Sequence, residues 1–355
     1  MQIILYLKPL KSQAFSCIMQ ILPSGNILKI CFGKGIFRMA VVLNKILSVF
    51  MIIAVGFVVN RRGILPSQAN KYLSNILMFI TSPCLILSSI TAKDINHETA
   101  VITVELIIGS CLWFAIFTAL GYFLCTKIIK VKPASDTGVF IFLFASLSNG
   151  FMGIPITMAL FDNDVLYLMI LHSTVLAIYL YAVGLPIVHV GTERSRGFSR
   201  HTLFIILKNP ATICAIVALT MLFAGLKFPT VIFDSVEMVG NFTTPLSMLI
   251  VGLQLGDSNL KRVVKNKNLL ALSVIRTISL PVLTFLMVNW LPIDVNIKVC
   301  LIFGAVFPAA VGTVAVSGSE GENALVAAEG VVLTTLISLF VIPLTAALLI
   351  GYYGL

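Results

Sequence analysis

The feature that most constrains this chain is a succession of ten apolar runs, each roughly as long as a bilayer is thick. A membrane-spanning helix needs about 20 predominantly apolar residues. Within lipid every backbone amide must be satisfied inside its own segment, so these runs predict helices. The predicted spans are Val41–Asn60, Tyr72–Ile90, Val101–Cys125, Gly138–Phe161, Val165–Val190, Ala211–Leu226, Val231–Leu255, Leu269–Trp290, Ile297–Ser317 and Leu325–Leu349.

The composition agrees with a membrane protein and disagrees with a soluble one. Hydrophobic residues make up 59% of the 355 positions and charged residues 11%, and the mean hydropathy is +1.05. Soluble domains carry about 25% charged residues. The 7 cysteines are scattered without a CxxC pair, so we expect neither a disulfide framework nor a metal site. The lipid bilayer is therefore the expected partner, and the net charge of +10 does not indicate nucleic acid.

That net charge comes mainly from alternate connections between the spans. Basic residues gather in the first, third, fifth and seventh connections, which carry Arg61, Arg62, Lys71, Lys127, Lys130, Lys132, Arg194, Arg196, Arg200, Lys208, Lys261, Arg262, Lys265 and Lys267. The positive-inside rule places these odd-numbered connections in the cytoplasm. The ninth connection has no Lys or Arg and gives no orientation. The prediction is a multi-pass protein of the cell membrane with both termini outside.

Residues 1–38 do not fit this pattern, because their basic residues would lie outside and no apolar stretch reaches spanning length. We expect a disordered extension or a mis-assigned start, with translation beginning at Met39. The remaining chain divides into a first five-helix repeat at 39–190, a cytoplasmic connection at 191–210 and a second five-helix repeat at 211–355. An interfacial helix is expected at Phe198–Lys208.

The division into repeats rests on matching prolines in the two halves. Thr81-Ser82-Pro83 in the second span corresponds to Thr243-Thr244-Pro245 in the seventh, and Pro155 in the fourth corresponds to Pro308 in the ninth. A unit of five spans is odd, so the second copy enters the membrane from the opposite face, as in many secondary transporters. Proline removes an amide and clashes one turn back, so we expect broken helices. Ordinary packing kinks are the alternative.

Two broken helices predict a substrate site. Free amides at the start of a half-helix carry roughly half a positive charge and suit a carboxylate. The candidate substrate-binding residues are Ser148, Asn149, Gly150, Gly153, Pro155, Pro308, Ala309, Gly312 and Thr313. No cofactor is expected beyond a coupling H⁺ or Na⁺.

Charged residues inside spans are costly and are functional candidates. Arg276 and Glu329 are therefore candidates for coupling or gating. The alternatives are that Arg276 extends to the cytoplasmic surface and that Glu329 is solvated near it. His172 either titrates or serves as a structural hydrogen-bonding residue.

Several motifs carry a family resemblance over about 41–350. They are Arg61-Arg62-Gly63-Ile64-Leu65, Ser148–Pro155, Thr244-Pro245-Leu246-Ser247, Val251-Gly252, Arg276 with Leu280-Pro281, and Thr334–Ser338 with Ile342-Pro343-Leu344. Their order and spacing resemble the auxin efflux carrier (PIN-like) family. The resemblance implies a scaffold domain and a transport domain whose crossed fourth and ninth helices hold the substrate, with Asn149, Pro155 and Pro308 at the crossing.

The short 191–210 connection resembles compact prokaryotic members associated with malate or malonate more than plant carriers with a long loop. A homodimer is a candidate assembly on the same ground. We therefore expect a secondary transporter, or uniporter, of a small organic anion such as a mono- or dicarboxylate. The alternative is a membrane sensor on the same fold that does not transport. An enzyme is not expected, because HExxH, GxSxG and GxxxxGK[ST] motifs are absent from the sequence.

Overall fold

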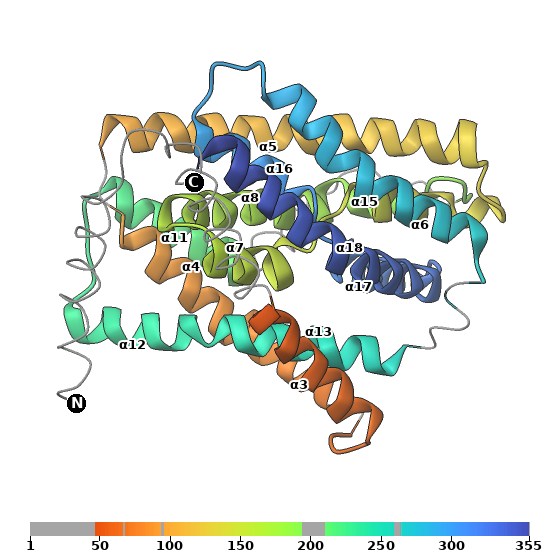
Figure 1. Cartoon of the computed structure of the whole chain (residues 1–355), viewed down its shortest axis with the longest axis horizontal. Helices are drawn as coiled ribbons and strands as arrows, with labels where there is room; N and C mark the ends of the chain where they lie inside the picture. Colours follow the sequence, from red (N-terminus) through yellow and green to blue (C-terminus); the bar gives the residue numbers. More distant parts are fainter. Residues whose placement is uncertain are drawn as a thin grey trace, which may run out of the picture. The chain divides into compact units, whose positions relative to one another are not determined.

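The computed structural model describes residues 47–66, 68–93, 96–193, 210–258, 263 and 265–354, and the regular structure in these ranges is helical (Figure 1). These ranges belong to one compact unit, Lys45–Leu355. The predictions for residues 1–38 and for an interfacial helix at Phe198–Lys208 lie outside the described residues.

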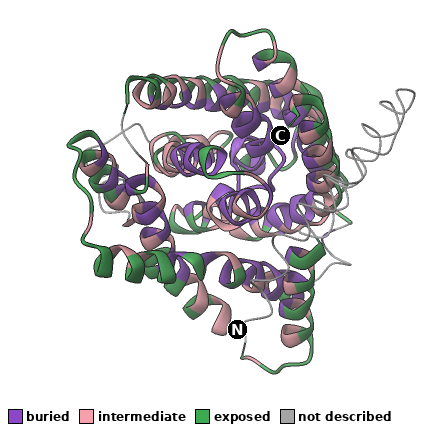
Figure 2. Cartoon of the chain, turned by 60° about the vertical axis from the view of Figure 1, so that its left-hand side comes forward, coloured by how far each residue is buried: buried purple, intermediate pink, exposed green. Residues whose placement is uncertain are grey.

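Seven helical segments are long and apolar enough to cross a membrane. They are Ala69–Thr91, His97–Ile129, Ala134–Leu160, Asn163–Ala182, Thr230–Asp257, Lys267–Val288 and Ala324–Tyr353. Shorter apolar helices at Leu47–Arg61, Thr212–Phe223 and Val295–Gly304 overlap the first, sixth and ninth predicted spans. The all-helical membrane architecture expected from the apolar runs is thus present, and Figure 2 shows the buried residues concentrated on its inner helices.

Polar residues begin several of these helices by capping free amides. The side chain of Asn96 accepts the amide of Thr99 ahead of α5 (His97–Phe123), and Asp162 accepts the amide of Val165 at the start of α8 (Asn163–Ala182). The same contact is made by Asn266 before α15 (Lys267–Val288) and by Asn323 before α18 (Ala324–Tyr353). Side-chain oxygens that bind first-turn amides favour helix starts, so each apolar run begins where such a residue precedes it.

The second and seventh predicted spans each consist of two helical pieces. In the second, α3 (Ala69–Ile76) passes through a π-helical turn, η1 (Leu77–Thr81), into α4 (Ser82–Thr91), whose first turn contains Pro83. In the seventh, α12 (Thr230–Asn241) gives way to α13 (Thr243–Asp257), whose first turn contains Pro245. Each proline thus lies within three residues after the change of helical pattern.

The helices pack as two groups. In the first group, α4 packs against α11 (Pro210–Phe223) and α12, and α13 packs against α3. Helix Leu47–Arg61 joins it through a close approach of backbones, since a Cβ on Gly252 would lie 2.1 Å from the carbonyl oxygen of Ile53. We call these helices the first group.

The second group comprises α5, α8, α15, α18 and the segments between them, α6 (Thr137–Ala145) and α16 (Val295–Gly304). Its core includes Phe117, Phe142 and Phe144, which are almost fully buried. The α9 helix (Gly184–Val188) continues α8 and packs against α6.

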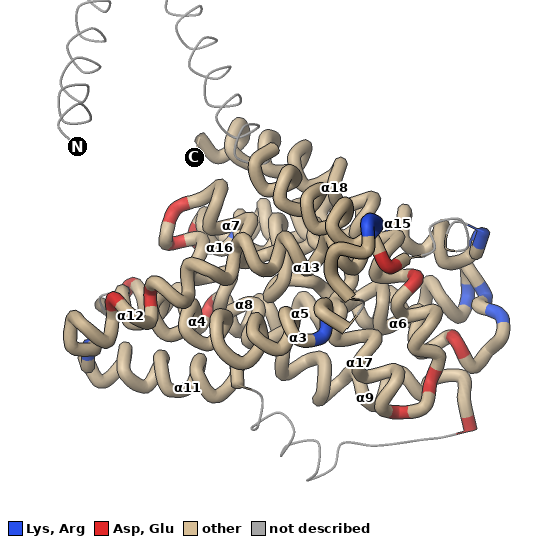
Figure 3. Tube along the Cα trace, turned by 90° about the horizontal axis from the view of Figure 1, so that it is seen from below, with Lys and Arg blue, Asp and Glu red and all other residues tan. Residues whose placement is uncertain are grey.

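Polar contacts at the helix ends join odd-numbered connections to odd-numbered ones and even-numbered connections to even-numbered ones. Asn60 donates to Asp257 over 2.7 Å, joining the first and seventh connections, and Gly138 donates its amide to Val190, joining the third and fifth. At the other end Lys93 pairs with Asp164, joining the second and fourth. Each contact joins connections that the charge pattern assigns to one side of the membrane. Figure 3 shows that most charged residues lie near the helix ends.

Candidate functional site

The fourth predicted span is interrupted between Ala145 and Asn149. The α6 helix ends at Ala145, Ser146 adopts an extended conformation with ψ of 146°, and helix resumes as the π-helical turn η4 (Asn149–Gly153) and α7 (Ile154–Leu160). The proline pattern predicts a break at Pro155. The observed break precedes Pro155 instead. Pro155 lies in the first turn of α7, where a proline fits a helix, and the extended Ser146 causes the interruption.

The ninth predicted span is interrupted around its proline. The α16 helix ends at Gly304, and α17 (Gly312–Ser319) begins after a linker that contains Pro308. The two breaks contact each other directly. The amide of Ser148 donates to the carbonyl of Pro308 over 2.7 Å, and the hydroxyls of Ser146 and Thr313 are 2.9 Å apart.

Arg276 of α15 lies beneath both breaks and is fully buried, so the interpretation that it extends to the surface is wrong. Its Nε donates to the carbonyl of Phe144 over 3.0 Å, its Nη1 to Phe307 over 3.1 Å, and its Nη2 to Ser146. A planar guanidinium offers five donors, which suits several carbonyls that broken helices leave without partners. No Asp or Glu of the described chain pairs with it.

Two hydroxyls of α18 complete the second break. Thr334 accepts the amide of Ala309 over 3.1 Å, and Ser338 donates to the carbonyl of Val306 over 3.1 Å. Both residues belong to the Thr334–Ser338 motif of the family resemblance, and neither is among the candidate site residues that the sequence predicts. Residues of α15 and α18 therefore satisfy backbone groups that the interrupted helices would otherwise leave unpaired in an apolar interior.

A cavity of about 230 Å³ adjoins the crossing of the two breaks. Of the nine candidate substrate residues, Ser148, Gly150 and Gly312 line it, and the other six do not. The remaining lining residues are Ser74, Met78, Ser82, Ile86, Leu147, Phe151, Ile154, Ser173, Thr174, Leu176, Ala177, Leu180, Tyr181, Ala310, Val311 and Ala315. Among the described residues the lining thus offers hydroxyls and apolar side chains and no charged side chain.

Asn149 is fully buried behind this wall, between the lining residues Ser148 and Gly150. Neither polar atom of its side chain has a hydrogen-bond partner among the described residues. The amide faces Gly304, where an added Cβ would lie 3.9 Å from its Nδ2 and 3.2 Å from Nε2 of His172. An unpartnered buried amide is costly, so its persistence needs a functional or solvent partner.

His172 is fully buried, which suits the alternative that it serves as a structural hydrogen-bonding residue. Its Nδ1 lies 2.8 Å from the Ser110 hydroxyl, and its ring stacks on Phe114 with centroids 5.3 Å apart. Glu329, in the second turn of α18, is 9% exposed and so is largely withdrawn from solvent.

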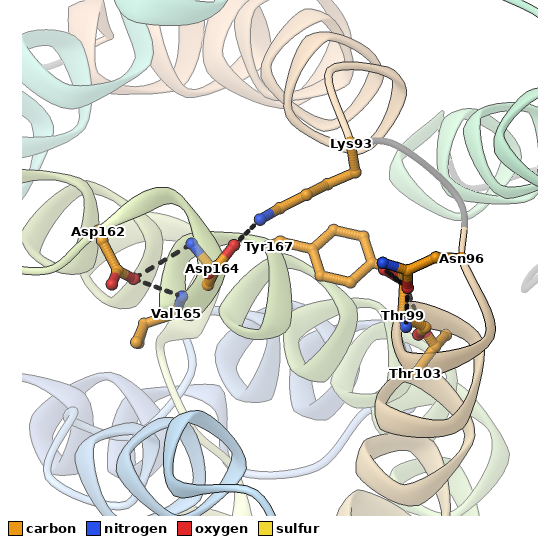
Figure 4. Close-up of polar contacts among 8 residues, drawn as sticks. All are labelled: Lys93, Asn96, Thr99, Thr103, Asp162, Asp164, Val165 and Tyr167. Carbon is orange, nitrogen blue, oxygen red and sulfur yellow. Dashed lines mark hydrogen bonds and ion pairs between the residues drawn. The ribbon is translucent and has the colours of Figure 1, made fainter.

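At the opposite end of α8, polar contacts join the two groups of helices (Figure 4). Lys93, just after α4 of the first group, pairs with Asp164 and lies 5.8 Å from the Tyr167 ring centre. The Tyr167 hydroxyl lies 2.8 Å from that of Thr103. Partial burial lowers the pKa of the Lys93 ammonium, and the Asp162 carboxylate opposes that shift. These contacts tie α4 to α8 at this end.

Comparisons with known proteins place the chain among transporters. The profile of the family described as membrane transport protein matches residues 41–346. An uncharacterized transporter of Methanocaldococcus jannaschii is 27% identical over 321 residues, which cover 87% of this chain and 99% of that protein. An uncharacterized transporter of Methanothermobacter thermautotrophicus is 22% identical over 162 residues, covering 45% and 52%. With apolar helices that suit several membrane crossings, this chain belongs to the membrane transport protein family, that of the auxin efflux carriers.

Proposed function

We propose that this protein moves a small organic anion, such as a mono- or dicarboxylate, across the cell membrane by alternating access. The observation that carries the proposal is the crossing of two broken helices above a buried Arg276 and beside a cavity. The half-helices that begin at Asn149 and Gly312 each present the amino-terminal end of a helix, which carries a partial positive charge.

The charge balance of the site favours an anion. Arg276 binds carbonyls at the carboxyl-terminal ends of the half-helices that precede the breaks, and it carries a full positive charge that no described carboxylate compensates. The cavity lies on the other side, where the half-helices begin, and its hydroxyls can donate to carboxylate oxygens. The amide of Asn149 is buried next to the wall at Ser148 and Gly150 and has no described partner, and we propose that it binds the carboxylate during the transport cycle.

The ten-span inverted repeat forms part of the same proposal. The helical pattern changes at the π-helical turn that ends at Thr81 and at Phe242, and the helices are interrupted at Ser146–Ser148 and in the linker that contains Pro308. This recurrence supports two repeats of five spans, with the first group of helices as scaffold and the second as transport domain. We place both termini outside, and we propose a homodimer assembled through the scaffold.

The structure corresponds to the state open to the cytoplasm in this proposal. On α8 the cavity-lining residues Ser173–Tyr181 lie in the half nearer the fifth connection, whereas the Lys93–Asp164 pair joins the two groups at the other end. The described contacts at the fifth-connection end, such as Asn60 with Asp257 and His189 with Glu320, each stay within one group. Transport then requires the Lys93–Asp164 contact to open.

The test is counterflow of labelled anion in proteoliposomes loaded with the same unlabelled anion. Malonate, malate and an aromatic monocarboxylate are compared, with the uncharged diamide of malonate as the control. We expect exchange of at least one carboxylate, with no competition from the diamide. Saturable binding without flux would instead favour a non-transporting sensor, and the absence of both binding and flux would overturn the anion assignment.

A further inference from the structure

A buried histidine lies between two carboxylates at the cytoplasmic end of the second group. Nδ1 of His189 is 3.0 Å from Oε1 of Glu322, and Nε2 is 3.0 Å from Oε2 of Glu320. The three side chains are 3%, 9% and 13% exposed, in the order His189, Glu322, Glu320. We call these residues the His189 cluster.

The geometry of the cluster requires a bound proton. A carboxylate oxygen only accepts hydrogen bonds, and a neutral imidazole carries a single N–H. Two ring nitrogens that both contact carboxylates therefore need one more proton than the fully deprotonated trio holds, on the ring or on one carboxyl group. Loss of that proton sets two acceptors against each other in a buried place, so one contact must open.

The cluster is linked to the cavity through two short paths. Glu320 caps the end of α17, which begins at the lining residue Gly312 and spans only about 12 Å at 1.5 Å per residue. His189 caps α9, which continues α8. The two paths meet again at the cavity, where an added Cβ on Gly312 would lie 2.8 Å from Cδ1 of Leu180. The α17 helix is thus held against α8 and α9 at both ends.

The elements next to the cluster carry other charged groups. At the start of α6, Asp136 accepts from Nδ2 of Asn323 over 3.1 Å and so has its own partner. Lys132 and Glu193 are exposed on the adjoining connections, and Glu329 is buried on α18. The basic residues between 194 and 208 lie outside the described part of the chain.

We propose that the His189 cluster binds one proton as a unit and that this proton, by fixing α17 against α9, couples anion transport to the proton gradient. The inference rests on the proposed function and identifies its coupling ion. Because coupling between two sites is reciprocal, a proton that fixes the cavity wall strengthens anion binding, and the anion strengthens protonation.

Proton binding can be tested without transport. The thermal midpoint of the purified protein is measured from pH 5 to pH 9 for wild type, His189→Gln and the double variant Glu320→Gln with Glu322→Gln. His97→Gln changes an exposed histidine in the same way and serves as the control. We expect a fall in the midpoint with rising pH in wild type and His97→Gln that both cluster variants lack. Identical pH profiles in all four proteins would overturn the proton site.

Coupling is tested by malonate flux with the membrane potential clamped. One coupled proton can drive accumulation of malonate up to about tenfold per pH unit, because a tenfold concentration ratio and a difference of one pH unit represent the same free energy. We expect His189→Gln and the double Glu variant to keep counterflow and to lose this accumulation, whereas Glu329→Gln and His97→Gln retain it. Accumulation that persists in both cluster variants overturns the inference, and loss confined to Glu329→Gln assigns coupling to that residue instead. Absence of wild-type counterflow contradicts the proposed function itself.

Discussion

The backbone amide of Ser148 donates to the carbonyl of Pro308 over 2.7 Å, so the interruptions of two helices from opposite halves of the chain are directly bonded. The hydroxyls of Ser146 and Thr313 repeat the link beside it. Hydrogen bonds between two interruptions satisfy backbone groups that would otherwise be unpaired in an apolar interior. The crossing is therefore a hydrogen-bonded polar region next to a mainly apolar cavity.

Arg276→Gln should destabilise the protein strongly. The shorter amide cannot serve the carbonyls of Phe144, Ser146 and Phe307 together, and each buried acceptor left unpaired costs about 1–3 kcal/mol. Thermal unfolding in detergent should show a midpoint several degrees below wild type. Arg276→Lys keeps the charge without the planar fork, so it should fall between the two. A wild-type midpoint for Arg276→Gln would show that the guanidinium does not hold the crossing together.

Ala177→Phe should abolish anion flux without unfolding the protein. Ala177 lines the cavity of about 230 Å³, and a phenyl ring there would occupy the space proposed for the anion. Ala115→Phe adds the same ring at an exposed position of α5 that does not line this cavity, and it should transport normally. Counterflow and thermal midpoints are measured for both. Equal flux in the two variants would place the transport path elsewhere.

The helices could be predicted from the sequence because apolar runs, capping residues and loop charges are local signals. The tertiary partners of the site could not be predicted in this way. Arg276 is hydrogen-bonded to carbonyls 132, 130 and 31 positions away. Its neighbours in the sequence are equally compatible with an arginine side chain that extends to the membrane surface. Pro155 was misleading for a related reason, since a proline marks a break only where the preceding segment also leaves the helix, here at Ser146.

The sequence predicts the part of the chain in which the nine candidate site residues lie, but it does not predict which of them line the cavity. Side chains of adjacent residues point in different directions, so Ser148 and Gly150 line the cavity whereas Asn149 between them is fully buried. Glycine and proline patterns locate a break in a helix but do not specify which side of it faces the cavity. The His189 cluster could not be predicted from the sequence, because its carboxylates lie 131 and 133 positions beyond the histidine.

Gly252→Ala should separate helix Leu47–Arg61 from α13. The new methyl group would lie 2.1 Å from the Ile53 carbonyl oxygen, which is backbone and cannot rotate away. Forced overpacking costs about 1–3 kcal/mol, so the thermal midpoint should fall. In Gly351→Ala in α18 the added Cβ would meet no described atom beyond the local helix backbone within 4 Å, so the variant should change the free energy of unfolding by less than about 1 kcal/mol. Equal midpoints for the two variants would refute the close approach.

Lys93→Met should shift the protein toward the state open on the opposite side. The variant removes the ion pair with Asp164 that joins the two groups of helices, and partly exposed pairs contribute about 0.2–1 kcal/mol. A membrane-impermeant maleimide added from that side should label Ser173→Cys up to about fivefold faster in the Lys93→Met background.

Lys298→Met is the matched control for this experiment, because Lys298 donates to Asn289 within the second group. Its labelling rate should equal that of wild type. Unchanged labelling in Lys93→Met would mean that the pair with Asp164 does not close this end.

The central claim is that the crossing of the two interrupted helices binds the transported anion. Counterflow of labelled malonate in proteoliposomes, measured for wild type, Asn149→Ala and Pro308→Ala at equal protein density, tests it most directly. We predict saturable exchange in wild type, with a rise of about tenfold or more in the half-saturating concentration for Asn149→Ala, as expected when a charged-group contact worth about 1.5–3 kcal/mol is lost. Pro308→Ala should reduce the maximal rate, because the linker that accepts the Ser148 amide would gain helical freedom. Exchange that is unchanged in both variants would contradict the account.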